Sequence, residues 1–474
     1  MTTGDQGAAR LDRDQLRRLT AEERALFAAR HPRSRALFDK ARAVLPAGVP
    51  MSWMAKWPGG FPVYVEHASG AHFVDVDGLD YIDFCLGDTG AMTGHSPPAT
   101  VEVVRRQVGQ GITTMLPTQD ATVVAEELGR RFGLPLWQFT LSATDANRHV
   151  IRYARHITGR PKVVVHDFCY HGSVDEAFAT LDGSGVTVAR RGNIGAPVPP
   201  SETTRVVPFN DVAALEEALS HGDVAAVLCE PALTNIGIVL PEPGYHEALR
   251  EITRRHGVLL VIDETHTLCT GPGGYTAAYG LEPDFLTLGK AIAGGIPAGA
   301  FGMSEQVAER IAARVALEDI DIGGVGGTLA GNALSLAAMR VTLADVLDDE
   351  AFARMVPLAH RWADGVDAGI AKYGLAWHCS RLGARAEYNF APSPPRDGAA
   401  AHAAGDFELE QFLHLFMLNR GLLLTPFHNM ALMSPDTSEA DVDRHTEVFL
   451  EALDVLTADA GAGAGRAVRG SQPG

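Results

Sequence analysis

The sequence predicts an α/β protein whose main sheet is mostly parallel and is covered by helices on both faces. From about His95 onward, short apolar runs alternate with amphipathic helical segments, for example the run VLLVIDE and the segment GYHEALREITRRHG. Short strands separated by helices are typical of parallel sheets that are buried on both faces. The 474 residues, 46% of them hydrophobic, are enough for two or three domains.

Composition and patterning divide the chain into five regions. A helical pattern runs from His31 to Val44, and the alternating apolar residues of segment 62–87 predict a small antiparallel sheet. We also expect disorder in residues 391–406, which contain Pro and Gly but little to bury. The predicted regions are a disordered or loosely ordered segment (1–30), the first part of a small domain (31–94), the large α/β domain (95–344), the rest of the small domain (345–458) and a disordered tail (459–474).

Six apolar runs predict strands of the main sheet: WQFTLS, KVVVHD, AAVLCEP, VLLVIDE, FLTLG and AGAFGM. Polar residues occur where these strands should end, namely Ser142, His166, Glu230, Asp263 and Lys290. The carboxyl ends of parallel strands meet at one edge of a sheet, where α/β proteins bind their ligands. These side chains are therefore expected to converge on one crevice.

Lys290 and Asp263 are the residues that point most directly to chemistry. Lys290 is one of five lysines and follows an apolar run; an amine removed from water becomes nucleophilic toward a carbonyl and forms a Schiff base. Asp263 ends an apolar run, so its carboxylate needs a cationic partner or several hydrogen bonds. Pyridoxal phosphate has an aldehyde for the lysine and a ring nitrogen that an acid keeps protonated. Taken singly, the two residues are also explained by a solvent-facing lysine and a capping or ion-pairing acid.

Three further features fit such a site. A helix begins near Thr144, after the strand end at Ser142, and the free N–H groups of a helix N-terminus bind phosphate. Tyr170 follows another strand and is placed to stack on a flat ring. Arg385, with Arg381 as the alternative, would bind a substrate carboxylate through paired hydrogen bonds. An ordinary helix cap, a core aromatic residue and solvated arginines are the simpler explanations.

Together these motifs resemble those of fold-type I pyridoxal-phosphate enzymes of the class III aminotransferase group. Within that group they are most similar to glutamate-1-semialdehyde aminomutase and the β-amino-acid aminotransferases. The resemblance extends over residues 46–444. It implies an aspartate-aminotransferase-like large domain with a mostly parallel seven-stranded sheet, and a small α+β domain built from the N- and C-terminal segments. It also implies a homodimer whose active sites are shared between subunits.

The resemblance assigns roles to residues in six motifs. VIDET places the acid that faces the pyridine nitrogen at Asp263, and TLGKAIAGGIPAGAFG makes Lys290 the lysine of the internal aldimine. In GGTLAGN, Thr328 would reach the phosphate of the neighbouring subunit. The resemblance implies further cofactor-binding residues in the motifs LSATDAN, CYHG and EPALTNIG and at the position after the Asp-Glu pair. These residues are Ser142, Ala143, Thr144, Tyr170, Glu230, Asn235 and Thr265.

The chain departs from the family pattern mainly around the substrate. Thr265-His266 replaces the usual Val-Met or Val-Gln, so that a hydroxyl would lie where an aliphatic side chain supports the ring. Ala143 and Asp145 replace a glycine and a glutamate in the phosphate turn. The segment PAGVPMSWMAKW lacks the carboxylate-binding arginine of the related enzymes. We therefore expect a reworked substrate pocket, for which the candidate lining residues are Trp53 and His428.

The predicted main activity is ping-pong amino transfer between a small-molecule amino donor and a keto acceptor, with Lys290 as the group that moves the proton. The alternative is an isomerase, either an aminomutase or an amino-acid racemase or epimerase, because both classes share the early chemistry. A non-catalytic cofactor-binding regulator is a third hypothesis. A metal hydrolase using His166 and His171 is a fourth, although these histidines lack ligand spacing on one element.

Bulk properties restrict the partners. The net charge of −18 argues against nonspecific binding to nucleic acid or to anionic membranes. No apolar stretch approaches the roughly 20 residues that span a bilayer, and the charged N-terminus lacks the apolar core of a secretory signal. The five cysteines are far apart and include no CxxC pair, which favours thiols in a reducing compartment and no metal site. We expect a cytoplasmic protein.

Overall fold

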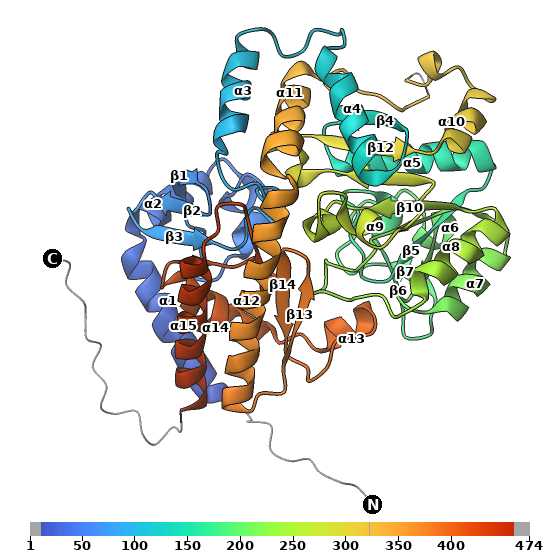
Figure 1. Ribbon diagram of the computed structural model, residues 1–474. Helices are drawn as coiled ribbons and strands as arrows, with labels where there is room; N and C mark the ends of the chain where they lie inside the picture. The colour runs from blue at the N-terminus through green and yellow to red at the C-terminus, as the bar shows by residue number, and fades with distance from the viewer. Residues whose placement is uncertain (1–10, 322, 459–474) are drawn as a thin grey trace, which may run out of the picture.

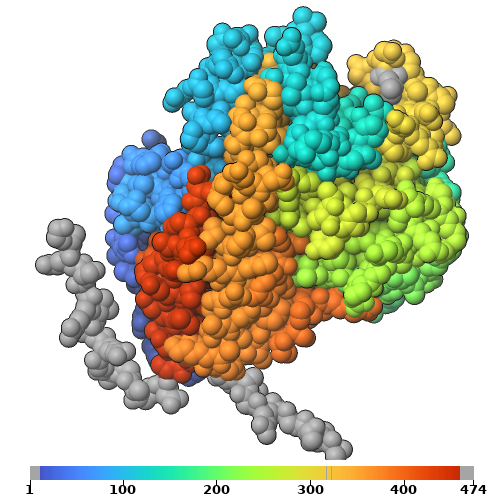
Figure 2. All heavy atoms as spheres, viewed as in Figure 1, coloured from blue at the N-terminus to red at the C-terminus, as the bar shows by residue number. Residues whose placement is uncertain are grey.

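The computed structural model describes residues 11–321 and 323–458. A seven-stranded sheet with helices on both faces forms one region, and the two ends of the chain form a smaller region beside it (Figure 1). The long helix α12 (Asp349–Tyr373) lies along the visible face between these two regions (Figure 2). Within the described ranges, no helix combines the length and the apolar character needed to cross a bilayer.

The main sheet confirms the predicted fold class. Its strand order is β4-β12-β11-β10-β9-β5-β8, and only β12 runs antiparallel to its neighbours. Six of the seven strands coincide with the predicted apolar runs; the seventh, β8, lies in the short segment TRVV, which was missed. The strands are β4 (Leu136–Thr140), β5 (Lys162–His166), β8 (Thr204–Val207), β9 (Val224–Cys229), β10 (Leu259–Asp263), β11 (Phe285–Leu288) and β12 (Gly299–Met303).

Alternate side chains of the central strands pack on opposite faces of this sheet. In β9, Ala226 and Leu228 belong to the core beneath α5, whereas Val227 and Cys229 belong to the core beneath α7 and α8. Both faces of the sheet are therefore buried beneath helices, as the uninterrupted apolar runs predict. The helices of this region are α3 (Pro98–Val108), α4 (Gln119–Phe132), α5 (Ala143–Thr158), α6 (Pro200–Thr203), α7 (Val212–Ser220), α8 (Tyr245–His256), α9 (Gly274–Ala278), α10 (Glu305–Ala312) and α11 (Ala333–Val341).

The smaller region joins segments from both ends of the chain. The predicted antiparallel sheet is present and gains a C-terminal strand, β15, which pairs in parallel with β3. A second sheet has the order β13-β14-β16, and a hairpin of β6 (Ala179–Leu181) and β7 (Thr187–Ala189) stands apart. The strands of the two small sheets are β1 (Val65–Ser69), β2 (His72–Asp75), β3 (Asp80–Asp83), β13 (His378–Leu382), β14 (Arg385–Asn389), β15 (Leu422–Leu423) and β16 (Met430–Leu432).

Helices of the smaller region correct two predictions of disorder. Residues 13–30 form α1 (Arg13–Arg30), whose Leu16 and Phe27 are buried and whose Gln15 Nε2 donates to Val455 O at 2.6 Å. The apolar residues of α1 are few but share one face, so composition alone concealed the helix. Within segment 391–406, a helix also forms, and its His402 stacks on Phe168. The helices are α1, α2 (Pro32–Ala41), α12, α13 (Gly398–Ala403), α14 (Phe407–Leu418) and α15 (Glu439–Thr457).

The remaining boundary predictions are not decided by these elements. Residues 1–10 and the predicted tail 459–474 lie outside the described residues. The boundary at 344/345 falls inside a π-helix, Thr342–Val346, which links α11 to α12. The division at 94/95 and at 344/345 stays a prediction.

Candidate active site

Seven of the predicted site residues line a cavity of about 310 Å³ at the carboxyl ends of β4, β10 and β11. This volume suits a small organic molecule. The cavity is lined by residues from strand ends and from the loop that precedes α3. Among the predicted site residues, those that line it are Ser142, Ala143, Thr144, Tyr170, Asp263, Thr265 and Lys290.

Lys290 stands one residue beyond Gly289, at the end of β11. Its backbone is left-handed, with φ of 53°, which is uncommon for a residue with a side chain. Its Nζ lies 2.9 Å from Oδ2 of Asp88 and 2.7 Å from Nε2 of His266. The amine therefore points into the cavity and is held there by two side chains, neither of which was predicted as a site residue.

Asp263 is buried, with 4% of its surface exposed, and three groups donate to its carboxylate. These are Asn147 Nδ2 at 2.9 Å, His171 Nδ1 at 2.9 Å and the backbone N–H of Thr265 at 3.0 Å. Burial alone would raise the pKa of Asp263, but His171 and the other donors lower it to about 2. A charged acid therefore faces the cavity, as a protonated ring nitrogen requires.

His171 is charged because of two of its neighbours, Cys169 and Asp263. Burial opposes a positive charge, but Cys169 and the carboxylate of Asp263 outweigh it and raise the pKa of His171 to about 10. Its Nε2 is buried without a hydrogen-bond partner among the described atoms. The pair of His171 and Asp263 thus fixes a charged carboxylate at one end of the cavity.

The other end of the cavity is the N-terminus of α5. Ser142 caps this helix by accepting from the N–H of Asp145 at 3.2 Å, and the first N–H groups of the helix have no partner within the helix itself. Two glycines permit the close approach: a Cβ at Gly172 would collide with Oγ1 of Thr144, and one at Gly289 would lie 2.8 Å from Cβ of Ala143. The helix N-terminus and the tight backbone form an anion cradle.

Tyr170, Glu230 and Asn235 border the cavity in different ways. Tyr170 lines it with 38% of its surface exposed, and its N–H donates to Glu230 Oε1 at 3.3 Å. Glu230 is buried, which raises its pKa, and Asn235 Nδ2 donates to the carbonyl of Phe168 at 3.2 Å. Glu230 and Asn235 therefore support the wall that carries Tyr170.

The structure separates the two candidate arginines. Arg385 is fully buried; its Nη2 donates to the carbonyl of Thr234 at 3.1 Å, and its Nη1 lies 3.5 Å from Nδ1 of His266. It is thus adjacent to a direct neighbour of Lys290. Arg381 instead pairs with two acids of α12, Asp364 and Asp367, each at 2.8 Å, and is not brought to the cavity.

The other candidate substrate residues, His428 and Trp53, are not among the residues that line the cavity. His428 is buried, and its Nδ1 lies 3.1 Å from Oε1 of Glu387, which is 3.6 Å from the guanidinium of Arg385. Trp53 lies on a short 3₁₀-helix, Ser52–Lys56, with 44% of its surface exposed. Thr328 is in a separate cavity of about 690 Å³ that residues 113–117 also line, so its role at a neighbouring subunit stays a prediction.

Four site residues were not assigned a role at the cofactor from the sequence: Asn147, His171, Asp88 and His266. A signal existed for Asn147, because it is a polar residue on the apolar face of α5. His266 appeared only as a departure from the family, and His171 only as a candidate metal ligand. Nothing in the sequence pattern around Asp88 indicates that it meets Lys290.

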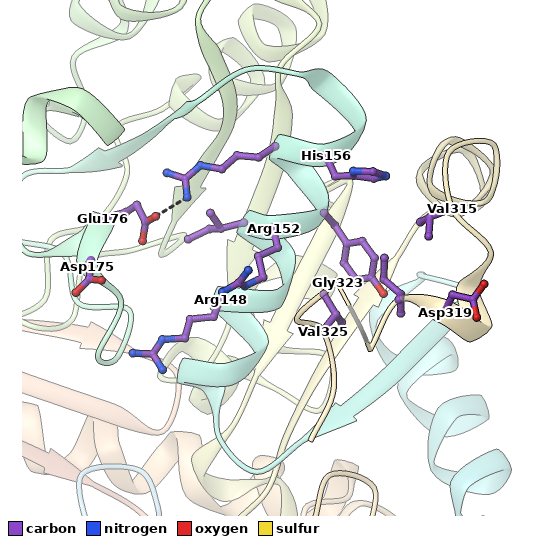
Figure 3. Close-up of a pocket in the computed structure, with 13 residues that line it drawn as sticks. Arg148, Arg152, His156, Asp175, Glu176, Val315, Asp319, Gly323 and Val325 are labelled. Atoms are coloured by element: carbon purple, nitrogen blue, oxygen red, sulfur yellow. Dashed lines mark hydrogen bonds and ion pairs between the residues drawn. The ribbon is translucent and has the colours of Figure 1, made fainter. Parts of the chain in front are cut away.

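A second cavity lies against the other part of α5 and has a different character (Figure 3). Its volume is about 650 Å³, and Arg148 and Arg152 project into it from successive turns of the helix. Arg155 pairs with Glu176 at 2.6 Å, and Arg148 donates to the carbonyl of Ser173. This cavity has no lysine and no strand-end acid, so the smaller cavity is the candidate active site.

Comparison with known proteins identifies the family. Residues 53–373 match the family Aminotransferase class-III, and the chain belongs to that family. A glutamate-1-semialdehyde 2,1-aminomutase from Sorangium cellulosum is 35% identical over 433 residues, which cover 90% of this chain and 97% of that protein.

Solved structures agree with this assignment. A glutamate-1-semialdehyde aminomutase from Pseudomonas aeruginosa superposes with a TM-score of 0.92 and 50% identity, covering 94% of this chain and 99% of that one. A lysine-to-alanine variant of such an enzyme was solved in complex with PMP. An omega-transaminase from Sphaerobacter thermophilus gives a TM-score of 0.81 at 29% identity, covering 90% of this chain and 98% of that one. The chain is a fold-type I enzyme that uses pyridoxal phosphate.

These comparisons correct the predicted main activity. The aminomutases named above are isomerases, which move an amino group within one molecule. The prediction of amino transfer between a donor and a separate keto acceptor is therefore wrong, and the findings favour the isomerase alternative. The two classes share the same cofactor-binding motifs, and the prediction of amino transfer depends on those motifs.

The residues present fit pyridoxal phosphate. Lys290 supplies an amine, Asp263 a charged carboxylate and the start of α5 an anion cradle, all on one cavity. Oγ1 of Thr265 is buried beside Asp263 without a hydrogen-bond partner among the described atoms, as expected for a group that binds a ligand. Across residues 11–321 and 323–458, no group of three or more His, Cys, Asp or Glu side chains is placed to hold a metal ion.

Proposed function

We propose that the protein is a pyridoxal-phosphate-dependent aminomutase that moves an amino group between neighbouring carbons of a small amino aldehyde. The observation that carries this proposal is the 50% identity, over 94% of the chain, to a protein named glutamate-1-semialdehyde aminomutase. Glutamate 1-semialdehyde is accordingly the first substrate to test.

The cofactor, when bound, supplies a carbonyl carbon that takes up amines and a ring that accepts electrons from the carbon being changed. Lys290 is the protein's amine for that carbon, and its Nζ is the group placed to take a proton from substrate and return it. Asp263, held by its three donors, keeps the ring nitrogen protonated. Ser142, Ala143 and Thr144 bind the phosphate, and Tyr170 covers one face of the ring.

Arg385 is the proposed partner of a substrate carboxylate. Its burial makes a charge-assisted hydrogen bond strong, and its Nη1 is near His266 and hence near Lys290. Glu387 at 3.6 Å offsets part of its charge, and His428 in turn contacts Glu387. Trp53, at the exposed 3₁₀-helix, is proposed to contact the substrate only at the entrance.

We further propose a homodimer in which Thr328 of each subunit binds the cofactor phosphate of the other. Thr328 is exposed and lies apart from the cofactor cavity of its own chain, which supports a role toward a second copy. Light scattering measures the mass, and a monomeric mass with full activity would exclude this arrangement. A cytoplasmic location is proposed because the five cysteines are free thiols, as a reducing compartment requires.

One experiment separates the proposed isomerase from a transferase. Cofactor-loaded protein is given glutamate 1-semialdehyde with no keto acid, and the products are followed by mass spectrometry and NMR. An aminomutase converts the substrate over many turnovers into an isomer of unchanged mass. Consumption that stops after about one equivalent, with release of a compound that has lost its nitrogen, would overturn the proposal.

A further inference from the structure

Two hydrogen-bond acceptors converge on the amine of Lys290. Oδ2 of Asp88 lies 2.9 Å from Nζ, and Nε2 of His266 lies 2.7 Å from it. Oδ1 of Asp88 is buried and has no partner among the described atoms. Two acceptors therefore face Nζ, and one of them, Asp88, is charged and has a second carboxylate oxygen with no hydrogen-bond partner among the described atoms.

The loop after β3 positions the two groups that accept from Lys290. Asp88 and Thr89 both have left-handed backbones, with φ of 50° and 80°, which are strained conformations for residues that carry side chains. The turn directs Asp88 toward Lys290 and places Oγ1 of Thr89 3.0 Å from Nδ1 of His266. One short segment thus positions both acceptors.

The protonation of these groups follows from their contacts. Burial would raise the pKa of Asp88, but Lys290 above all holds it well below the usual value, so Asp88 is charged. Burial, and then the charge of Lys290, lowers the pKa of His266 to about 3, so its ring is neutral. Because an ammonium can only donate, Nε2 accepts and the ring proton lies on Nδ1, where it is donated to Thr89.

Such a pair of acceptors binds any primary ammonium, not Lys290 alone. When Lys290 is engaged with the cofactor, Asp88 keeps its charge and its unpartnered oxygen. An enzyme that moves an amino group within one molecule must also hold that molecule while a second nitrogen is present.

Resting on the proposed aminomutase function, we propose that Asp88 and His266 form an ammonium-binding subsite. The subsite holds the Lys290 ammonium when the lysine is free, and it holds the free amino group of the substrate when the lysine is engaged. Arg385, near Nδ1 of His266, would bind the carboxylate end of the same molecule.

The first test uses Lys290→Ala without any cofactor. Removing the resident ammonium leaves the subsite free, so ethylammonium chloride should raise the melting temperature relative to the same concentration of sodium chloride. The shift should disappear in Lys290→Ala/Asp88→Asn and persist in Lys290→Ala/Asp443→Asn, because Asp443 is an exposed acid that pairs with Arg361. A shift of equal size in the Asp88 double variant overturns the proposal.

The second test uses the cofactor-loaded protein and compares ethylenediamine with ethylamine by their effect on the absorbance near 400 nm. Wild type should reach half-saturation with the diamine at a concentration lower by at least about 10-fold, the usual worth of a hydrogen bond to a charged group. Asp88→Asn should lose this preference and Asp443→Asn should keep it. An unchanged preference in Asp88→Asn contradicts the subsite. Neither test measures turnover, so failure to isomerise would remove the proposed function while these results would still decide whether an ammonium binds here.

Discussion

Two sets of residues surround the active site, here called its first and second walls: the first, from the large sheet, lines most of the cavity, and the second, Asp88 and Arg385, contacts Lys290 or His266 from segments outside that sheet. On the first wall, Asp263 and Lys290 follow adjacent parallel strands, and the register that pairs Asp263 with Thr287 fixes their separation. On the second wall, Asp88 and Arg385 belong to segments that meet only when the small sheets pack against the large one. The comparison indicates that cofactor chemistry is set by strand register, whereas substrate contacts depend on packing between regions.

The largest effect should come from the first wall. Lys290→Ala removes both the amine for the cofactor and the proton-transfer group, so turnover should fall by at least about 1,000-fold. Lys162→Ala is the matched control, because Lys162 stands at the start of β5 and pairs with Asp223. Initial rates and the absorbance of borohydride-treated protein measure the effect. Comparable losses in both variants would contradict the role of Lys290.

Asp263→Asn should lower turnover by about 100-fold, because a neutral amide cannot keep the ring nitrogen protonated. Asp284→Asn is its control on the neighbouring strand, where Asp284 pairs with Arg250 and accepts from the N–H of Leu260. That variant should lose about 1–3 kcal/mol of unfolding free energy yet keep its turnover. Equal turnover in the two variants would contradict the assignment of the catalytic site to the carboxyl ends of the strands.

A smaller effect is expected on the second wall. Arg385→Lys keeps a buried charge opposite Glu387 but loses the planar donor pair, so KM for a carboxylate substrate should rise about 10-fold. Arg381→Lys, at the surface pairs with Asp364 and Asp367, should leave KM unchanged. Steady-state kinetics on both variants provide the measurement. A rise in KM for the Arg381 variant alone would show that Arg381, and not Arg385, binds the substrate carboxylate.

The smallest effect concerns a buried histidine outside both walls. Burial lowers the pKa of His445 to about 3, so between that value and about 6.5 the unfolded chain binds a proton that the folded chain does not. Stability therefore falls as the pH drops below about 6.5. The His445→Phe variant keeps an aromatic ring against Trp362. Between pH 7.5 and 5.5 its free energy of unfolding should fall by about 1 kcal/mol less than that of the wild type. Urea unfolding at both pH values tests this, and parallel losses would refute it.

The sequence was sufficient for the first wall because its signals are local. Asp263 ends an uninterrupted apolar strand, Ser142 precedes an amphipathic helix, and Lys290 is one of few lysines, so strand-end geometry placed all three. The same reasoning missed β8, whose four residues are too short to form a pattern. It also missed α1, because the apolar residues of that helix are few.

The second wall could not be predicted in the same way. Arg381 and Arg385 are four residues apart in one hairpin, yet only Arg385 is buried, where it contacts the loops that follow β9 and β10. The meeting of Asp88 with Lys290 depends on a left-handed turn that no local pattern announces. The reaction class could not be predicted from the sequence either, because transferases and isomerases share the motifs of the first wall.

The pairing of β3 with β15, and of α1 with the C-terminal helices, also affects how the protein is made. During synthesis, the C-terminal partners of β3 and α1 emerge more than 300 residues after these elements, once the strands of the large sheet have been made. At about 5–20 residues per second, the N-terminal segment waits roughly 15 seconds or longer for them. The large sheet can form in that interval, but β3, which precedes the turn that carries Asp88, gains its partner β15 only after residue 423 has emerged.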